Sequence, residues 1–134
     1  MIALERARLR AERQDAWIHF VLGDIFELAR SIGPFDLVYD CGLYHSVRQV
    51  NLERHLDMLW RVTRPGSHYL CLAGAPDKTA EDGPPQVTED EIHNELGRLF
   101  EFVHLRRTRL ENPTRKVGHP GWSCLMQRPM VGAK

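Results

Sequence analysis

The chain of 134 residues is long enough for one domain with a buried core, and its 43% apolar and 27% charged residues are typical of a globular protein. Its 18 basic residues balance 18 acidic ones, so no net charge favours binding to nucleic acid or to an anionic membrane. No apolar run approaches the roughly 20 residues that cross a bilayer, and the first residues do not follow the order of a signal peptide.

The three cysteines and seven histidines indicate neither disulfides nor a metal site. Cys41, Cys71 and Cys124 are far apart in the sequence, form no C-x-x-C pair, and lie in or beside apolar runs. The histidines lack the spacing of metal ligands. We therefore expect a cytoplasmic protein with reduced thiols and without a metal.

The first part of the chain alternates helical and strand patterns. Residues 2–14 favour a helix, because apolar and charged side chains interleave among strong helix formers. Residues 17–22, Trp-Ile-His-Phe-Val-Leu, are rich in β-branched and aromatic side chains and predict a strand that ends at Gly23. A short helical turn over 26–31 and a strand over 35–40 follow.

The middle of the chain continues this alternation. Apolar residues at i, i+4, i+7 and i+10 predict a helix over 47–63, which the Arg-Pro-Gly sequence at 64–66 ends. Residues 68–73 are apolar along most of their length, as expected of a strand covered on both faces. A Thr-x-x-Glu capping box at 88–91 marks the start of another helix.

Two strand-like segments close the chain, at 100–110 and 122–126. They are joined by a polar connection without a helix, which predicts an antiparallel hairpin. The earlier alternation of strands and helices predicts parallel crossovers. The expected fold is therefore a single α/β domain over residues 1–134, with a mostly parallel sheet that ends in a C-terminal antiparallel hairpin.

Four short motifs occur in a fixed order along this chain, at 1–7, 20–24, 35–45 and 59–72. Residues 35–45 read F-D-L-V-Y-D-C-G-L-Y-H, which is similar to the fourth-strand motif of class I S-adenosylmethionine-dependent methyltransferases. Within this family, the D-x-G-x-x-H form most resembles the thiopurine and thiol methyltransferase-like branch. The other three motifs resemble the helix after the second strand, the Gly-Asp sequence after the third strand, and the helix exit with the fifth strand.

The resemblance implies S-adenosylmethionine as the cofactor and places its adenine at the end of the 17–22 strand. Asp24 would accept a hydrogen bond from the exocyclic amine, the backbone N–H of Ile25 would lie beside the ring, and Phe26 would lie against it. The alternative is that Asp24 only caps the helical turn at 26–31. Both roles are compatible with one another.

The turn after the 35–40 strand would carry the methionine end of the cofactor. Asp40, Cys41 and Gly42 would line it, because ligands of open parallel sheets bind beyond the carboxyl ends of strands. Gly42 lets the backbone approach a ligand, although a strand-end turn requires glycine equally. Members of this branch often carry arginine where Cys41 stands.

Tyr44 and His45 would face the methyl donor and form the catalytic pair. His45 has a pKa range suited to taking a proton from a thiol, hydroxyl or amine acceptor. A histidine that only caps a helix or lies on the surface is the alternative. Methyl transfer depends more on positioning than on acid–base help, so it does not require a base.

The chain contains no G-x-G sequence, so the family's glycine-rich cofactor loop is missing from it. The resemblance implies a strand order of 3-2-1-4-5-7-6, of which strands 1 and 2 would precede Met1. We therefore expect an N-terminally truncated sheet whose 35–40 strand has an open edge. Through this edge the chain would self-associate or bind a complementing chain.

Two functions follow from this expectation. The first is S-adenosylmethionine-dependent methyl transfer to a small-molecule acceptor, with the help of an absent N-terminal segment or a partner chain. The acceptor would be framed partly by residues 74–86. The alternative is a non-catalytic α/β domain that derives from a methyltransferase and serves in interaction or assembly.

Overall fold

A computed structural model of the chain describes residues 2–78, 83–111 and 117–130. The predicted connection between the last two strands therefore lies partly outside the described residues. The elements in chain order are α1 (Ile2–Arg13), α2 (Ile25–Leu28), β1 (Leu37–Cys41), α3 (Leu43–Val62), β2 (His68–Gly74), α4 (Glu89–Leu96), β3 (Glu101–Leu110) and β4 (His119–Gln127).

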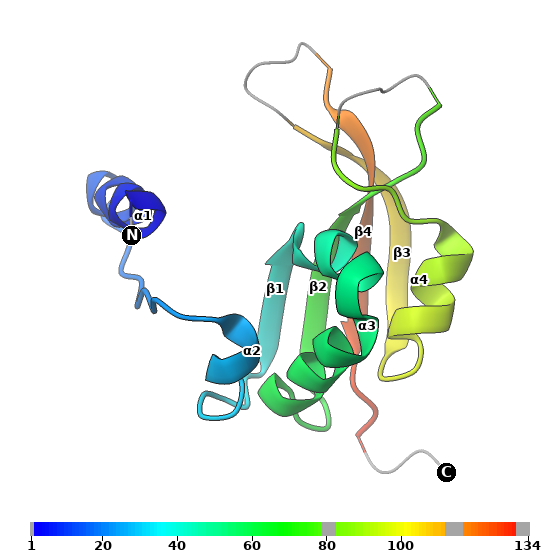
Figure 1. Cartoon of the computed structure of the whole chain (residues 1–134), viewed down its shortest axis with the longest axis horizontal. Coiled ribbons are helices and arrows are strands. Elements are labelled where there is room, and N and C mark those ends of the chain that lie inside the picture. The colour runs from blue at the N-terminus through cyan, green and yellow to red at the C-terminus, as the bar shows by residue number, and fades with distance from the viewer. Residues whose placement is uncertain (1, 79–82, 112–116, 131–134) are drawn as a thin grey trace.

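The four strands form one sheet in the order β1-β2-β4-β3 (Figure 1). β1 pairs with β2 in parallel, and β4 pairs antiparallel with both β2 and β3. The predicted α/β class and the C-terminal antiparallel hairpin are confirmed. The order equals the expected 4-5-7-6 part of the methyltransferase sheet. Only one of the three pairings is parallel, and residues 17–22, expected as a further strand, do not join the sheet.

The prediction of a strand over 17–22 is wrong for this structure. These residues form no strand, and the side chains of Trp17 and Leu22 are 93% and 66% exposed. In Figure 1 this segment leads from the outlying α1 to α2 without running beside β1. A strand requires a neighbour for its backbone N–H and C=O groups, and here none lies within reach among the described strands.

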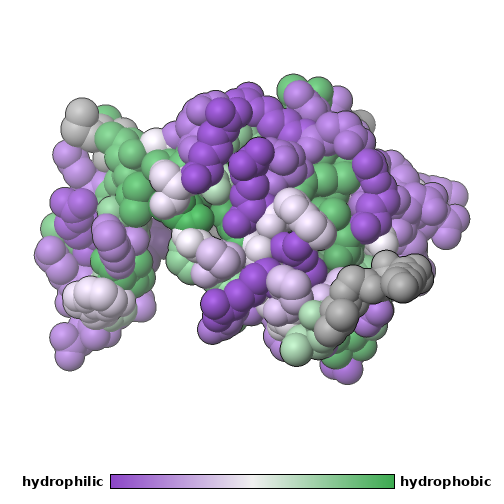
Figure 2. Space-filling view, turned by 90° about the horizontal axis from the view of Figure 1, so that it is seen from below, coloured by the Kyte–Doolittle hydropathy of each residue, from purple (hydrophilic) through white to green (hydrophobic). Residues whose placement is uncertain are grey.

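The hydrophobic core lies between the sheet and the helices α3 and α4, which cover one of its faces (Figure 1). The opposite face of β1 is open, since Leu37 and Tyr39 are each 59% exposed. In Figure 2, hydrophobic surface is visible between the outlying N-terminal lobe and the body of the protein. The largest fully buried side chains are those of Tyr44, Tyr69, Leu59, Ile92, Leu96 and Met126.

The central helix α3 begins four residues before the predicted start at residue 47. Gly42 is its N-cap residue with a φ of 100°, and the helix contains one non-helical residue, Asn51. The Oδ1 atom of Asn51 accepts a hydrogen bond from the backbone N–H of Arg54 at 3.0 Å, which caps the second half of the helix. The early start brings Tyr44 and His45 into the first helical turn.

The far end of α3 is closed by a side chain from the other end of the chain. The Arg128 guanidinium donates to the backbone oxygens of Trp60 and Thr63 at 3.0 and 2.8 Å and lies 3.3 Å from the centroid of the Trp60 ring. Near the other predicted helix start, Thr88 and Glu91 form the expected capping box of α4. Arg128 thus ties the end of α3 to the segment that follows β4, and the capping box closes the start of α4 locally.

His55 is a buried polar residue without a hydrogen-bond partner among the described residues. Its side chain is 0% exposed, both ring nitrogens are unsatisfied, and burial lowers its pKa. Because the folded protein resists protonation of this ring, stability falls as the pH drops below about 6.5, where the unfolded chain takes up the proton.

We expect His55→Leu to raise the free energy of unfolding by about 1–2 kcal/mol at pH 7.5 and by more at pH 5.5. Urea unfolding at both pH values would measure this difference. His19→Leu, at an exposed histidine, serves as the control. An equal effect of the two substitutions, or a smaller gain at pH 5.5, would contradict the expectation.

Candidate active site

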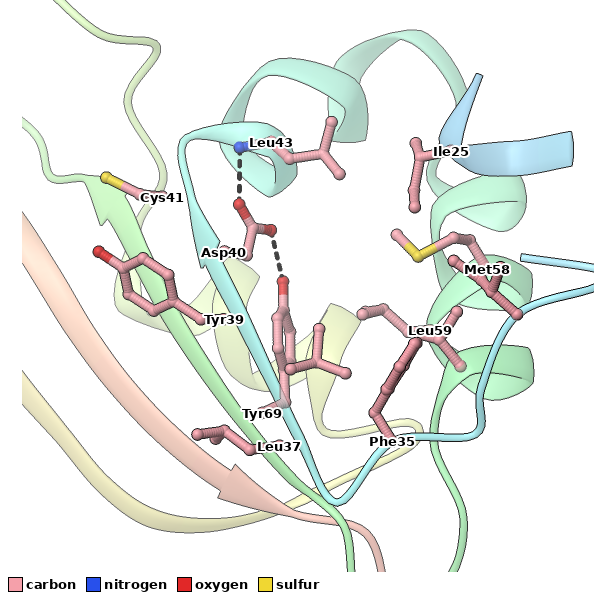
Figure 3. Close-up of a pocket in the computed structure, with 13 residues that line it drawn as sticks. Ile25, Phe35, Leu37, Tyr39, Asp40, Cys41, Leu43, Met58, Leu59 and Tyr69 are labelled. Carbon is pink, nitrogen blue, oxygen red and sulfur yellow. Dashed lines mark hydrogen bonds between the residues drawn. The ribbon is translucent and has the colours of Figure 1, made fainter. Parts of the chain in front are cut away.

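Asp40 is a nearly buried carboxylate at the carboxyl end of β1. Its Oδ1 accepts from the backbone N–H of Leu43 at 2.7 Å and its Oδ2 from that of Tyr44 at 3.0 Å, so the carboxylate caps α3. Oδ2 also accepts from the Tyr69 hydroxyl on β2 at 2.7 Å. Figure 3 shows the Leu43 and Tyr69 contacts converging on this one side chain. Asp40 therefore fixes the turn that follows β1.

The turn consists of Cys41 and Gly42. Cys41 is exposed, and the backbone N–H of Gly42 donates to the Leu72 oxygen of β2 at 3.2 Å. Gly42 has a φ of 100°, a conformation that a residue with a Cβ adopts only with strain. The turn is thus held in place and has no side chain at its second position, where a Cβ would lie 3.2 Å from Nε2 of His45.

His45 lies just behind this turn and is 7% exposed. Its Nδ1 accepts a hydrogen bond from the backbone N–H of Gly74, at the carboxyl end of β2, at 2.8 Å. Burial lowers the pKa of His45, and the nearby Asp40 opposes this only in part. The Nδ1 lone pair, with which a general base would take up a proton, is therefore already engaged in a hydrogen bond. This contact does not favour the predicted role of His45 as a proton acceptor.

Tyr44 faces into the core and is 0% exposed. Its hydroxyl donates to Glu95 of α4 at 2.6 Å, and Arg48 donates to both Glu95 and Glu91. Burial, together with the hydrogen bond to Glu95, raises the pKa of Tyr44. The structure therefore corrects the prediction that Tyr44 faces a methyl donor: its hydroxyl ties the first turn of α3 to α4.

The predicted adenine residues lie at the start of α2. Asp24 is exposed and is the N-cap residue, with Oδ1 accepting from the backbone N–H of Phe26 at 2.9 Å. The capping role is thus confirmed. Ile25 is the first helical residue, so its backbone N–H stands outside the helical hydrogen-bond ladder. The Phe26 ring stacks against the Arg54 guanidinium at 4.7 Å, so one of its faces is covered.

A hollow of about 460 Å³ lies along the open edge of β1. It separates α2 from β1, and its walls are mostly aliphatic, including Ile25, Met58 and Leu59 (Figure 3). Tyr39 and Cys41 point to the opposite side of the strand, so the hollow extends around the strand edge. A mostly apolar hollow beside an unpaired strand has the character of an unfilled core rather than of a polar ligand site.

The structure brings together only part of the predicted site. Ile25, Asp40 and Cys41 border the same hollow, and Gly42 and His45 meet at the adjacent turn. Within the described residues, no group of histidine, cysteine and carboxylate side chains could hold a metal ion. No helix in that part of the chain is long and apolar enough to span a membrane.

A family model described as thiopurine S-methyltransferase matches residues 3–132, nearly the whole chain. The chain belongs to this family. It is 37% identical over 81 residues to the thiopurine S-methyltransferase of Equus caballus, and 36% identical over 86 residues to that of Bos taurus. These matches cover 60% and 63% of this chain but 32% and 35% of the relatives. This family member thus spans about a third of the length of the curated relatives it matches.

Solved structures confirm the class I methyltransferase fold of this family member. One of them belongs to a study of the conversion of a disulfide bond into a thioacetal group during echinomycin biosynthesis. It is 17% identical to this chain and has a TM-score of 0.74, and the match covers 94% of this chain and 62% of that protein. The N-methyltransferase NodS of Bradyrhizobium japonicum WM9, in complex with S-adenosyl-L-homocysteine, is also 17% identical, with a TM-score of 0.69 over 95% and 62%.

Three residues of this region were not singled out from the sequence. Tyr69 and Gly74 contact the site from β2, and Glu95 does so from α4. Each contacts a residue at least 29 positions away in the chain. No local pattern marks such partners, although Gly74 directly follows a predicted strand.

We expect Asp40→Asn to lower the free energy of unfolding by about 1–3 kcal/mol, because an amide cannot accept from all three donors and would place an N–H against one of them. Asp36→Asn is the matched control: this carboxylate is 83% exposed and pairs with Arg64 at the surface, so its loss should cost less than about 0.5 kcal/mol. Urea unfolding of both variants measures the difference, and equal midpoints would refute the central role of Asp40.

Proposed function

We propose that this protein takes part in S-adenosylmethionine-dependent methyl transfer to a small-molecule acceptor. The observation that supports this most directly is the rigid Cys41–Gly42 turn at the carboxyl end of β1, with the α2 N-terminus across the adjacent hollow. Ligands of open α/β sheets bind at this edge. Membership of the thiopurine S-methyltransferase family supports the same reaction class.

The residues present fit one side of the cofactor. Asp24 uses Oδ1 for its helix cap, which leaves its exposed Oδ2 to accept from an exocyclic amine. The backbone N–H of Ile25 points outside the ladder of α2 and would donate to the same ring. The Cys41–Gly42 turn would lie at the methionine end. Phe26 is less suited than expected, because Arg54 covers one face of its ring.

The cofactor, when bound, supplies an electrophilic methyl group, so the protein's task is to hold the acceptor in line and to exclude water. Asp40 serves this task by fixing the turn, and Tyr44 by fixing the first turn of α3 to α4. Neither side chain needs to touch the acceptor for this. We place both as positioning residues.

The other side of the cofactor would be held by a complementing segment or partner chain. The chain has no G-x-G sequence, and among the described strands the outer edge of β1 is unpaired, beside a hollow of about 460 Å³. A strand added along β1 would satisfy its backbone groups, and apolar side chains on that strand would fill the hollow. We further propose that the protein acts in the cytoplasm on a small molecule, without nucleic acid.

The second candidate is a non-catalytic interaction domain. The observation that favours it is the same edge of β1, together with the open face of this strand, where Leu37 and Tyr39 are each 59% exposed. In that case the edge would be the functional surface, and the Cys41–Gly42 turn would bind no cofactor.

Amide chemical shifts recorded with S-adenosylhomocysteine at millimolar concentration distinguish the two candidates. Methyl transfer predicts shifts at Ile25 and at Cys41–Gly42. Asp24→Asn keeps the helix cap but removes the charge, and should weaken binding about tenfold or more. Glu27→Gln, an exposed substitution in the same helix, should bind as the unmodified chain does. Shifts elsewhere, or none, would sink the methyltransferase proposal.

Edge association is tested by sedimentation over a range of concentrations. We expect the unmodified chain to show a mass that rises with concentration, and Leu37→Lys with Tyr39→Lys to abolish the rise, because charged side chains block strand pairing. Val103→Lys makes the same change at a 56% exposed position on β3, at the opposite edge of the sheet, and should leave association intact. A constant monomer mass would contradict self-association.

A further inference from the structure

His45 stands between two glycines at the ends of adjacent strands. On one side its Nδ1 accepts from the backbone N–H of Gly74 at 2.8 Å. On the other side its ring borders Gly42: a Cβ added there would lie 3.2 Å from Nε2 and 3.6 Å from Cε1. The absence of a side chain at Gly42 therefore leaves the space beside Nε2 open.

The contact with Gly74 determines the protonation state of the ring. A backbone N–H can only donate, so the nitrogen that accepts from it carries no proton. In a neutral imidazole the proton then resides on Nε2. Only 7% of the His45 surface is exposed. This burial lowers the pKa of His45, so the neutral ring is the stable form.

The Nε2–H group has no partner among the described residues, and it is not fully enclosed. This N–H group lies at a strand end, next to a turn with open space. It is therefore a hydrogen-bond donor that a ligand atom with a lone pair can pair with. The Gly74 contact also prevents the ring from flipping, because Nδ1 would lose its donor. The direction of the free N–H group is thus fixed before any ligand arrives.

We propose that His45 binds the small molecule at this site as a fixed, neutral hydrogen-bond donor, through Nε2–H, and does not act as a proton acceptor. Its partner is a lone-pair atom of the ligand, such as a carboxylate or carbonyl oxygen, lying over Gly42. This inference rests on the proposed function of the Cys41–Gly42 turn. It adds a residue that selects ligands with an acceptor at this point and excludes those with a donor there.

Three substitutions separate the two nitrogens. In His45→Asn, the side-chain oxygen can replace Nδ1 as the acceptor for Gly74, while the Nε2 donor is lost. In His45→Gln, the amide reaches toward the Nε2 position, while the acceptor for Gly74 is lost. His45→Ala removes both groups. Stability should therefore follow the Gly74 contact, and ligand binding should follow the Nε2 donor.

Nitrogen-15 NMR of the imidazole in the full 134-residue chain gives a readout that does not depend on activity. We expect a protonated Nε2 and an unprotonated Nδ1 at neutral pH, and a shift of Nε2 when S-adenosylhomocysteine is added. His45→Asn should retain the unfolding midpoint and lose about tenfold in affinity for this probe. A proton on Nδ1, or unchanged affinity in His45→Asn, would overturn the proposal.

The same titration separates this inference from the proposed function. Shifts at Ile25 and Cys41–Gly42 without a shift at the Nε2 atom of His45 would overturn the donor role alone. Addition of 5′-methylthioadenosine, which lacks the amino-acid part of the probe, locates the acceptor atom. Loss of the Nε2 shift with this compound assigns the contact to the amino-acid part, and its retention assigns the contact to the nucleoside part. Absence of all shifts with both compounds would overturn the proposed function and the inference together.

Discussion

The carboxylate of Asp40 is the contact on which the rest of the site depends. It joins β1 to the first turn of α3 through two backbone N–H groups and to β2 through the Tyr69 hydroxyl. Because the first turn of α3 is fixed in this way, His45 reaches Gly74 and Tyr44 reaches Glu95. A buried anion with three donors is stable only where all of them are present, so one side chain specifies the geometry of two strands and a helix.

Features with a local cause could be predicted from the sequence. The capping box at 88–91 and the end of α3 at Arg64-Pro65-Gly66 depend on neighbouring residues, and both were predicted correctly. The start of α3 was missed because its cap is Asp40, separated from the helix by Cys41 and Gly42. The 17–22 strand was predicted wrongly, because strand formation depends on a pairing partner, and sequence alone does not show whether one is present.

The same difference between local and distant causes applies to the candidate site. The turn at Gly42 and the cap at Asp24 follow from residue type and position, and the structure has both. The roles of Tyr44 and His45 depend on Glu95 and Gly74, which lie 51 and 29 residues further along the chain. A sequence motif marks these two residues as important without saying which way they face. Tyr44 turned out to be buried, and His45 turned out to have its Nδ1 engaged.

β1 therefore has two features that could bind a partner or a ligand, its outer edge and the turn at its carboxyl end. The two are structurally separate. Among the described strands its outer edge has no neighbour, whereas its carboxyl end holds a turn with the Nε2–H donor of His45 beside it. Asp40 and Tyr69 fix the turn, and Gly74 fixes the ring of His45 beside it. Under the proposed function, a strand paired along this edge would add walls to the ligand site, and the Nε2–H donor of His45 would already be in place. Under the proposed function, the half of the site that this chain would contribute is organised before a complementing segment binds.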